Sequence, residues 1–142
     1  MQKPNLIALF TGLMSVALFG MAQQPKPKIN NVPIKQTSPA SGQQMYTTYC
    51  AVCHGADGTG NGPAASALKI PPVDLTTLSQ KNGGTFPANH VSTVLQFGIE
   101  NPAHGTPDMP IWGDLMQSLH GGPTQVHLRV VNLTNYLKQM QK

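Results

Sequence analysis

The pentapeptide at 50–54, Cys-Ala-Val-Cys-His, is the sequence feature that most restricts how this chain can fold. Cys50 and Cys53 are the only two cysteines of the chain, and a histidine directly follows the second one. On a helix, residues i and i+3 lie on one face, so both thiols can reach the two vinyl groups along one edge of a porphyrin. His54 then follows under the ring, where its imidazole can bind the iron. This spacing indicates covalent attachment of a haem, for which the fold must leave room.

Three other uses of closely spaced cysteines fit the sequence less well. A thioredoxin-like redox pair needs a βαβ context, whereas here a helical pattern precedes the cysteines. A structural zinc site takes four protein ligands, and the adjacent Cys50, Cys53 and His54 supply only three. A Cys50–Cys53 disulfide is an option for a chain that has not received its haem. We therefore favour haem attachment.

The N-terminal segment predicts export from the cytoplasm. Lys3 precedes an uncharged, mostly apolar stretch at 6–19, and small residues follow at 20–22. This order is typical of a signal peptide, so we expect residues 1–22 to be one, with cleavage before Gln23. An uncleaved membrane anchor is the alternative, because the longest version of the apolar stretch just reaches the lower limit for a span. Either way, we expect the protein in the bacterial periplasm, free or tethered to the outer face of the cytoplasmic membrane.

The remainder of the chain divides into a tether and one domain. Residues 23–40 hold four prolines, three lysines and few apolar side chains, which predicts a flexible tether. Residues 41–142 have the usual size of a single domain, and the haem motif occurs in them once. The chain has a net charge of +4, but basic and acidic residues balance within the domain. No cluster of Lys and Arg indicates a nucleic-acid partner.

Three helical patterns predict that this domain is all-α. The first starts near Ser41 and runs through the pentapeptide, and the second spans 87–97 with Gly98 as its stop. The third repeats apolar residues over 126–140, with Thr124 as its expected N-cap. The apolar stripe of the first helix consists of Tyr46, Tyr49, Cys50 and Cys53. Glycine- and proline-rich connections separate the helices, so the domain needs a large group such as haem to pack on.

A haem with six iron ligands needs a second axial ligand, for which Met109 is the best candidate. It lies in a proline-stiffened segment, Thr-Pro-Asp-Met-Pro at 106–110, that can hold a thioether over the iron. Met45 is too close to the attachment helix to cross the ring, and Met140 belongs to the apolar stripe of the last helix. The alternatives that remain are Met116 and the histidines at 90, 104, 120 and 127.

From Ser41 to its C-terminus, the chain resembles class I monohaem c-type cytochromes. The haem motif runs into a glycine-rich stretch at 55–64 that is similar to the continuation of the family's haem-binding helix. The segments at 71–76 and 109–113 resemble its mid-chain haem-edge segment and its methionine-ligand loop, and Asn135-Tyr136-Leu137 resembles the aromatic pattern of its closing helix. Asp108 is a departure, because many relatives pass from a Thr-Pro pair directly to the methionine.

This resemblance implies a class I cytochrome c fold, in which three or more helices surround one covalently attached haem c. It also implies that the first and last helices cross where Gly42 allows close approach, with Tyr136 packed there. Trp112 is expected near the haem, either hydrogen-bonded to a propionate or simply packed. The expected haem-binding residues are Cys50 and Cys53 for the covalent bonds, His54 and Met109 for the iron, and Trp112.

His/Met ligation leaves no iron position open to a substrate, and the soft thioether raises the reduction potential. We therefore expect a monomeric one-electron carrier and not an enzyme. Its redox partners would be a donor dehydrogenase or cytochrome complex and an acceptor oxidase or reductase, with membrane contact only through an anchor or such a complex. One alternative is a fixed electron-entry subunit of a membrane dehydrogenase or oxidase complex. If Met109 does not ligate, the open iron would indicate a gas sensor or a weak peroxidase.

Overall fold

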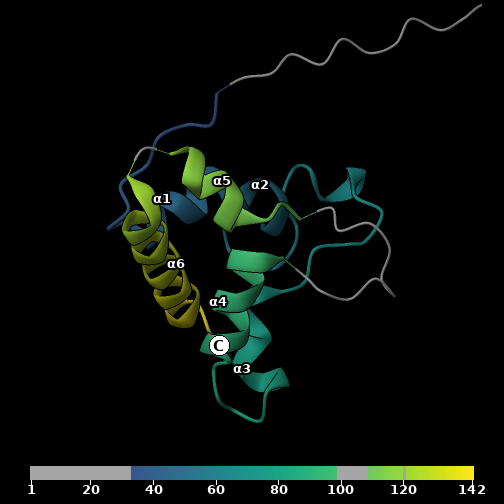
Figure 1. The fold of residues 1–142 in the computed structure, drawn as a ribbon. Helices are drawn as coiled ribbons and strands as arrows, with labels where there is room; N and C mark the ends of the chain where they lie inside the picture. The colour runs from purple at the N-terminus through teal and green to yellow at the C-terminus, as the bar shows by residue number, and fades with distance from the viewer. Residues whose placement is uncertain (1–32, 99–108, 120) are drawn as a thin grey trace, which may run out of the picture. The chain divides into compact units, whose positions relative to one another are not determined.

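The computed structural model describes residues 33–98, 109–119 and 121–142. Over these ranges the chain forms helices and loops without a β-strand, which confirms the prediction of an all-α domain (Figure 1). The predicted signal peptide at 1–22 and the first ten residues of the predicted tether lie outside the described residues. No helix in the described part is both long and apolar enough to cross a membrane.

The predicted first helix is a continuous helical segment made of three parts: α1 (Gly42–Met45), the π-helical turn η1 (Tyr46–Cys50) and α2 (Ala51–His54). The helix starts near Ser41, as predicted, and Ser41 is its N-cap, whose hydroxyl accepts a hydrogen bond from the Gln44 amide at 3.1 Å. In the π-helical turn the Ala51 amide donates to the Tyr46 carbonyl, five residues back. Such a turn places one extra residue in the helix and so changes which face the following residues present.

The remaining elements follow in chain order. Two short 3₁₀ turns, η2 (Ala65–Ala67) and η3 (Leu75–Thr77), precede the single-turn helix α3 (Leu78–Lys81). The three longer helices are α4 (Ala88–Phe97), α5 (Trp112–Ser118) and α6 (Gly122–Gln139). The predicted helix at 87–97 is confirmed, and it ends at Gly98 with a φ of +79°, a left-handed conformation that favours glycine.

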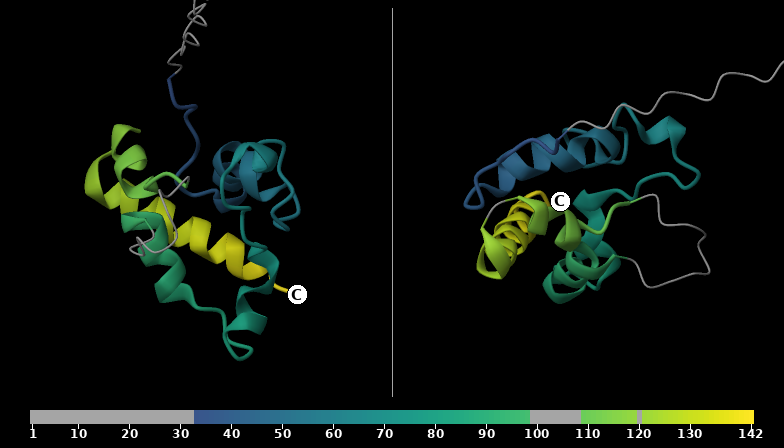
Figure 2. Two further views of the ribbon diagram at one scale, coloured as in Figure 1. Left: turned by 90° about the vertical axis from the view of Figure 1, so that its right-hand side faces the viewer. Right: turned by 45° about the horizontal axis from the view of Figure 1, so that its top comes forward.

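The segment 42–54 crosses α6, and α4 and α5 pack against α6 and against each other (Figures 1 and 2). Gly42 lies at the crossing, where a Cβ would meet the Asn132 carbonyl oxygen and, at 2.7 Å, the Cβ of Tyr136. Close to this point the rings of Tyr46 and Tyr136 lie 5.4 Å apart. The predicted contact between the first and last helices is therefore confirmed.

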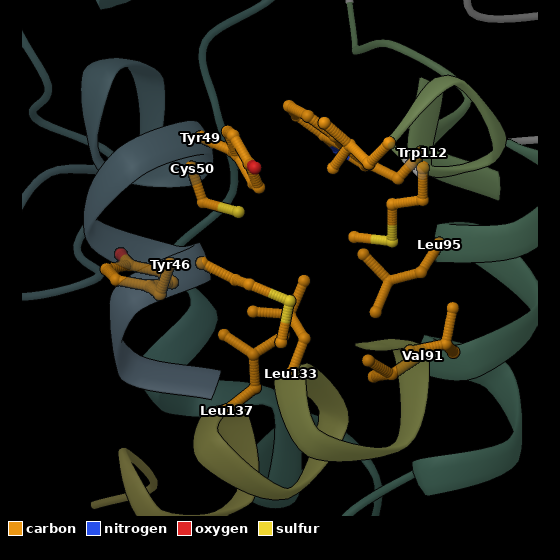
Figure 3. Close-up of a cluster of buried hydrophobic side chains, with 12 residues drawn as sticks. Tyr46, Tyr49, Cys50, Val91, Leu95, Trp112, Leu133 and Leu137 are labelled. Carbon is orange, nitrogen blue, oxygen red and sulfur yellow. The ribbon is translucent and has the colours of Figure 1, made fainter. Parts of the chain in front are cut away.

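One cluster of buried apolar side chains joins these helices (Figure 3). The segment 42–54 contributes four members to this cluster: Met45, Tyr46, Tyr49 and Cys50. The other members are Val91 and Leu95 of α4, Trp112 and Met116 of α5, the following Leu119, and Val130, Leu133 and Leu137 of α6. The haem motif is thus built into the domain core at its first cysteine.

The start of the last helix differs from the prediction. Thr124 is not its N-cap, because α6 begins at Gly122 and Gly121, with a φ of +142°, precedes it. Pro123 therefore lies in the first helical turn, where its missing N–H costs no hydrogen bond and its fixed φ suits the helix. Helix α5 was not predicted, since its seven residues are too short for a clear apolar period.

Residues 33–40, the end of the predicted tether, pack on the domain. Thr37 is buried, and its hydroxyl and carbonyl oxygens both accept hydrogen bonds from Arg129 of α6 at 2.9 Å. Asn132 of α6 also donates to the Pro39 carbonyl at 2.9 Å. These contacts hold the approach to α1 against the last helix.

The close crossing at Gly42 predicts that adding a side chain there lowers the stability of the protein. Gly42→Ala should reduce the free energy of unfolding by about 1–3 kcal/mol, because its Cβ overpacks the crossing. An ordinary glycine-to-alanine change within a helix instead stabilises by about 1 kcal/mol. Denaturant unfolding of the haem-loaded protein measures the difference, with the exposed Gln43→Ala as control. A Gly42→Ala protein as stable as the parent would contradict the crossing.

Candidate haem-attachment site

The two cysteines differ in their surroundings. Both thiols are free in the structure. Cys50 is buried in the core cluster, and burial raises the pKa of its thiol to about 12, with a smaller contribution from Cys53. Cys53, one turn on, is half-buried. The π-helical turn ends at Cys50, whose side chain points into the core (Figure 3).

His54 ends α2 with its imidazole in a defined orientation. Its Nδ1 lies 3.2 Å from the Val73 carbonyl oxygen, and since a carbonyl can only accept, Nδ1 carries the proton. The lone pair of Nε2 is then free to bind a metal. Burial lowers the pKa of His54 below its usual value, although the hydrogen bond to Val73 opposes this, so the ring is neutral near pH 7. This is the tautomer and charge state that an iron ligand needs.

The glycine-rich loop at 55–64 caps the C-terminal end of α2. The amides of Gly60, Gly62 and Ala64 donate to the last carbonyl groups of the helix, at 2.8 to 3.0 Å. Helix C-termini leave carbonyls without partners, and this loop supplies the missing donors. Those amides are therefore occupied and cannot form a phosphate-binding cradle, and the stretch instead reverses the chain beside His54.

Gly62 shows why this loop needs small residues. A Cβ at Gly62 would come within 2.6 Å of backbone atoms of Ala51 and Cys53. The loop therefore lies directly on the attachment turn. The hydroxyl of Tyr46 adds a further restraint by donating to the Gly55 carbonyl at 2.6 Å. Together these contacts hold the attachment turn from both ends.

Trp112 lies across the core cluster from Cys50, and Met109 precedes it in the chain by three residues. Met109 is half-buried and packs against the core cluster, three residues before Trp112 opens α5. Trp112 is buried, and its ring stacks on that of Tyr49 with 5.5 Å between centroids. In Figure 3, Tyr49 and Cys50 point from one side toward Trp112 on the other. The role of Trp112 at the haem stays a prediction, and the rest of the predicted loop at 106–108 lies outside the described residues.

The other candidate ligands have different surroundings. Met116 is fully buried on α5, and Met140 packs at the edge of the core, in keeping with roles as core residues. His90 and His127 are exposed, whereas His104 and His120 lie outside the described residues. In the described ranges no group of three or more His, Cys, Asp or Glu side chains is arranged to hold a metal ion.

Exposed apolar side chains lie beside His54 and close to Met109 in the sequence. Val73, whose carbonyl accepts from His54, leaves 57% of its side chain exposed, and Phe97 leaves 64% exposed. Ile111, between Met109 and Trp112, is exposed and lies 3.1 Å from where a Gly98 Cβ would be. Two free thiols and a neutral imidazole are the groups that bind a covalent haem, and exposed apolar side chains can pack on its ring.

Comparison with known families agrees with this site. The sequence profile of the cytochrome c family matches residues 39–114, more than half of the chain, so the chain belongs to the cytochrome c family. It is therefore an electron-transfer haem protein, with covalently bound haem c and redox partners with which it exchanges electrons. The expected class I cytochrome c fold is confirmed by this match and by the helices described above.

A solved structure has a similar fold. One chain of the reducing HAO-like protein complex from Kuenenia stuttgartiensis matches 85% of this chain, with a TM-score of 0.53 and 23% sequence identity. The present chain spans about half of that chain, 53% of its length. A comparison with curated proteins gave no match.

Sequence reasoning missed the polar residues behind the attachment turn. Arg129 of α6 is buried, and it reaches Thr37, whose hydroxyl lies 2.9 Å from that of Tyr49. The sequence did indicate that Arg129 could be buried, because it follows the apolar Val126 by three residues and so lies beside the apolar stripe of its helix. Its partner is 92 residues away, so the sequence alone could not identify it.

The buried Tyr46 hydroxyl predicts a pH dependence of stability. Burial raises its pKa to about 12, above the value of about 10 in an unfolded chain. The unfolded state then ionises first, so the contribution of Tyr46 is complete below pH 10 and is lost as the pH rises from about 10 to 12.

Tyr46→Phe removes both the hydrogen bond and this ionisation. The variant should be about 1 kcal/mol less stable than the parent at pH 8, with the gap narrowing toward pH 11.5. Denaturant unfolding of the reduced haem protein at the two pH values measures it. An equal gap at both values would contradict the assigned role of the buried hydroxyl.

Proposed function

We propose that this protein is a single-haem carrier that moves one electron at a time between partners outside the cytoplasmic membrane. In this proposal Cys50 and Cys53 form the two thioether bonds, and His54 and Met109 bind the iron. The observation that supports it most is the orientation of His54, since Nδ1 donates to Val73 and Nε2 is left for the metal. The two free thiols precede it on the same helical segment.

The roles of the protein groups follow from their surroundings. Bound haem c supplies an iron that alternates between the ferrous and ferric states. His54 is held neutral and oriented, so it needs no proton transfer or rotation when the electron moves. A Met109 thioether favours ferrous iron, and the buried side chains around Cys50 penalise the extra charge of the ferric state. Both effects raise the reduction potential.

The proposal includes no catalytic role. With His54 and Met109 both on the iron, no position is open for a substrate, and the protein would act only by exchanging electrons. The predicted signal peptide supports export to the periplasm, where donor and acceptor proteins would be a dehydrogenase or cytochrome complex and an oxidase or reductase. Trp112, stacked on Tyr49, would pack beside the haem.

A second candidate is a fixed subunit of a larger redox complex. Two features favour it: the balance of charges on the domain, which gives no strong field to steer a mobile partner, and the similar fold of a chain from a protein complex. Gentle extraction followed by size-exclusion chromatography distinguishes a mobile carrier from a fixed subunit. A carrier elutes as a free 15.1 kDa chain or less, and a subunit elutes with its partners.

Met109→Leu tests the proposed distal ligand. The side-chain volume is nearly conserved, so the fold should remain, but the iron should lose its soft ligand. We expect haem to stay attached, the midpoint potential to fall, and reduced protein to bind carbon monoxide. Absorption spectroscopy and redox titration measure these changes.

Met116→Leu is the matched control, because Met116 is also near α5 but is fully buried in the core. It should keep the spectrum and potential of the parent. If Met116→Leu opens the iron and Met109→Leu does not, the assignment of the distal ligand is wrong.

A further inference from the structure

Arg129 is a buried positive charge behind the haem-attachment turn. Only 3% of this residue is exposed. Two of its guanidinium nitrogens donate to Thr37, one to the hydroxyl and one to the carbonyl, both at 2.9 Å. Its third nitrogen, Nε, is buried and has no hydrogen-bond partner among the described residues. Both acceptors are neutral, so the charge of Arg129 is solvated but not cancelled there.

A chain of hydrogen bonds connects this charge to the haem motif. Arginine can only donate, so the Thr37 hydroxyl accepts from it and passes its own proton toward the Tyr49 hydroxyl, 2.9 Å away. Tyr49 in turn donates to the Lys35 carbonyl at 2.6 Å. Each hydrogen bond of this chain is therefore donated in the same sense, from Arg129 to Thr37, from Thr37 to Tyr49 and from Tyr49 to the Lys35 carbonyl.

Tyr49 links this chain of hydrogen bonds to the haem motif. It directly precedes Cys50, and its ring stacks on Trp112, which follows the Met109 segment. The Tyr49 ring is thus held at its hydroxyl end by Thr37 and on its face by Trp112. Figure 3 shows Tyr49 and Cys50 side by side in the core. Two residues, Thr37 and Tyr49, thus connect the buried charge to Cys50, which is proposed to carry the first thioether bond.

We propose that Arg129, positioned through Thr37 and Tyr49, raises the reduction potential of the haem. This inference rests on the proposed function, because it requires a haem at Cys50. A fixed positive charge destabilises the ferric state more than the ferrous state, which carries one positive charge less. Since Arg129 is buried, salt should screen its effect only weakly. Arg129 is a positioning and electrostatic residue and touches no reacting atom.

The test compares midpoint potentials of haem-loaded variants at about 0.05 M and 0.5 M salt. Arg129→Met removes the charge and keeps most of the length, and we expect a lower potential at both salt concentrations. Arg129→Lys keeps the charge and should stay near the parent. Lys138→Met is the matched control, because Lys138 is an exposed cation on the same helix. Any shift that it causes should be smaller and should disappear at high salt.

A second variant keeps the test decisive if Arg129→Met does not fold. Thr37→Asp leaves Arg129 in place but sets a carboxylate beside its guanidinium, which should also lower the potential. A parental potential in a folded Arg129→Met or Thr37→Asp protein overturns the proposal. An equal fall in Arg129→Lys and Arg129→Met also overturns it, because the effect would then come from packing rather than charge.

Two readouts separate this inference from the proposed function. Pigment that stays with the polypeptide on denaturing electrophoresis shows covalent haem, and carbon monoxide binding by the parent shows an open iron. A parent without covalent haem, or with an open iron, contradicts the proposed function itself. Far-ultraviolet circular dichroism reports whether each variant keeps the helices of the parent.

Discussion

The close crossing of the segment 42–54 with α6 is the contact on which the rest of the structure depends. At Gly42 the two helices approach so closely that no Cβ fits beside the Asn132 carbonyl. The crossing fixes the direction in which the segment leaves α6, and with it the positions of Cys50 and His54 further along. Tyr46 packs on Tyr136 next to the crossing and donates to Gly55 beyond His54, so one side chain links the crossing to the far end of the site.

The second half of the site depends on backbone groups rather than on side-chain chemistry. The loop at 55–64 gives its amides to the last carbonyls of α2, and the Val73 carbonyl orients His54. On the other side, Tyr49 holds Trp112 and so fixes the start of α5 just after Met109. Held in this way, the proposed iron site would need little rearrangement when its charge changes, which suits the exchange of single electrons between proteins.

Local sequence patterns predicted the parts of this arrangement that depend on short-range contacts. The start of the first helix near Ser41 and the end of the second helix at Gly98 are each set within a few residues, and the structure has helix ends at these places. The predicted start of α6 is wrong because proline is common both in loops and in the first turn of a helix, and Pro123 lies in the first turn. The hydrogen bonds from Arg129 to Thr37 join residues that are 92 positions apart, and the spacing of apolar residues along the chain does not reveal such a contact. The roles of Cys50, Cys53, His54, Met109 and Trp112 at the haem remain predictions.

An optical spectrum of the exported, haem-loaded protein, oxidised and reduced, with and without carbon monoxide, tests the central claim most directly. With His54 and Met109 both on the iron, we expect a low-spin c-type spectrum, a far-red methionine–iron band in the oxidised protein, and no change with carbon monoxide. A high-spin spectrum that shifts on adding carbon monoxide would show an open iron and would contradict the proposed closed electron-transfer site.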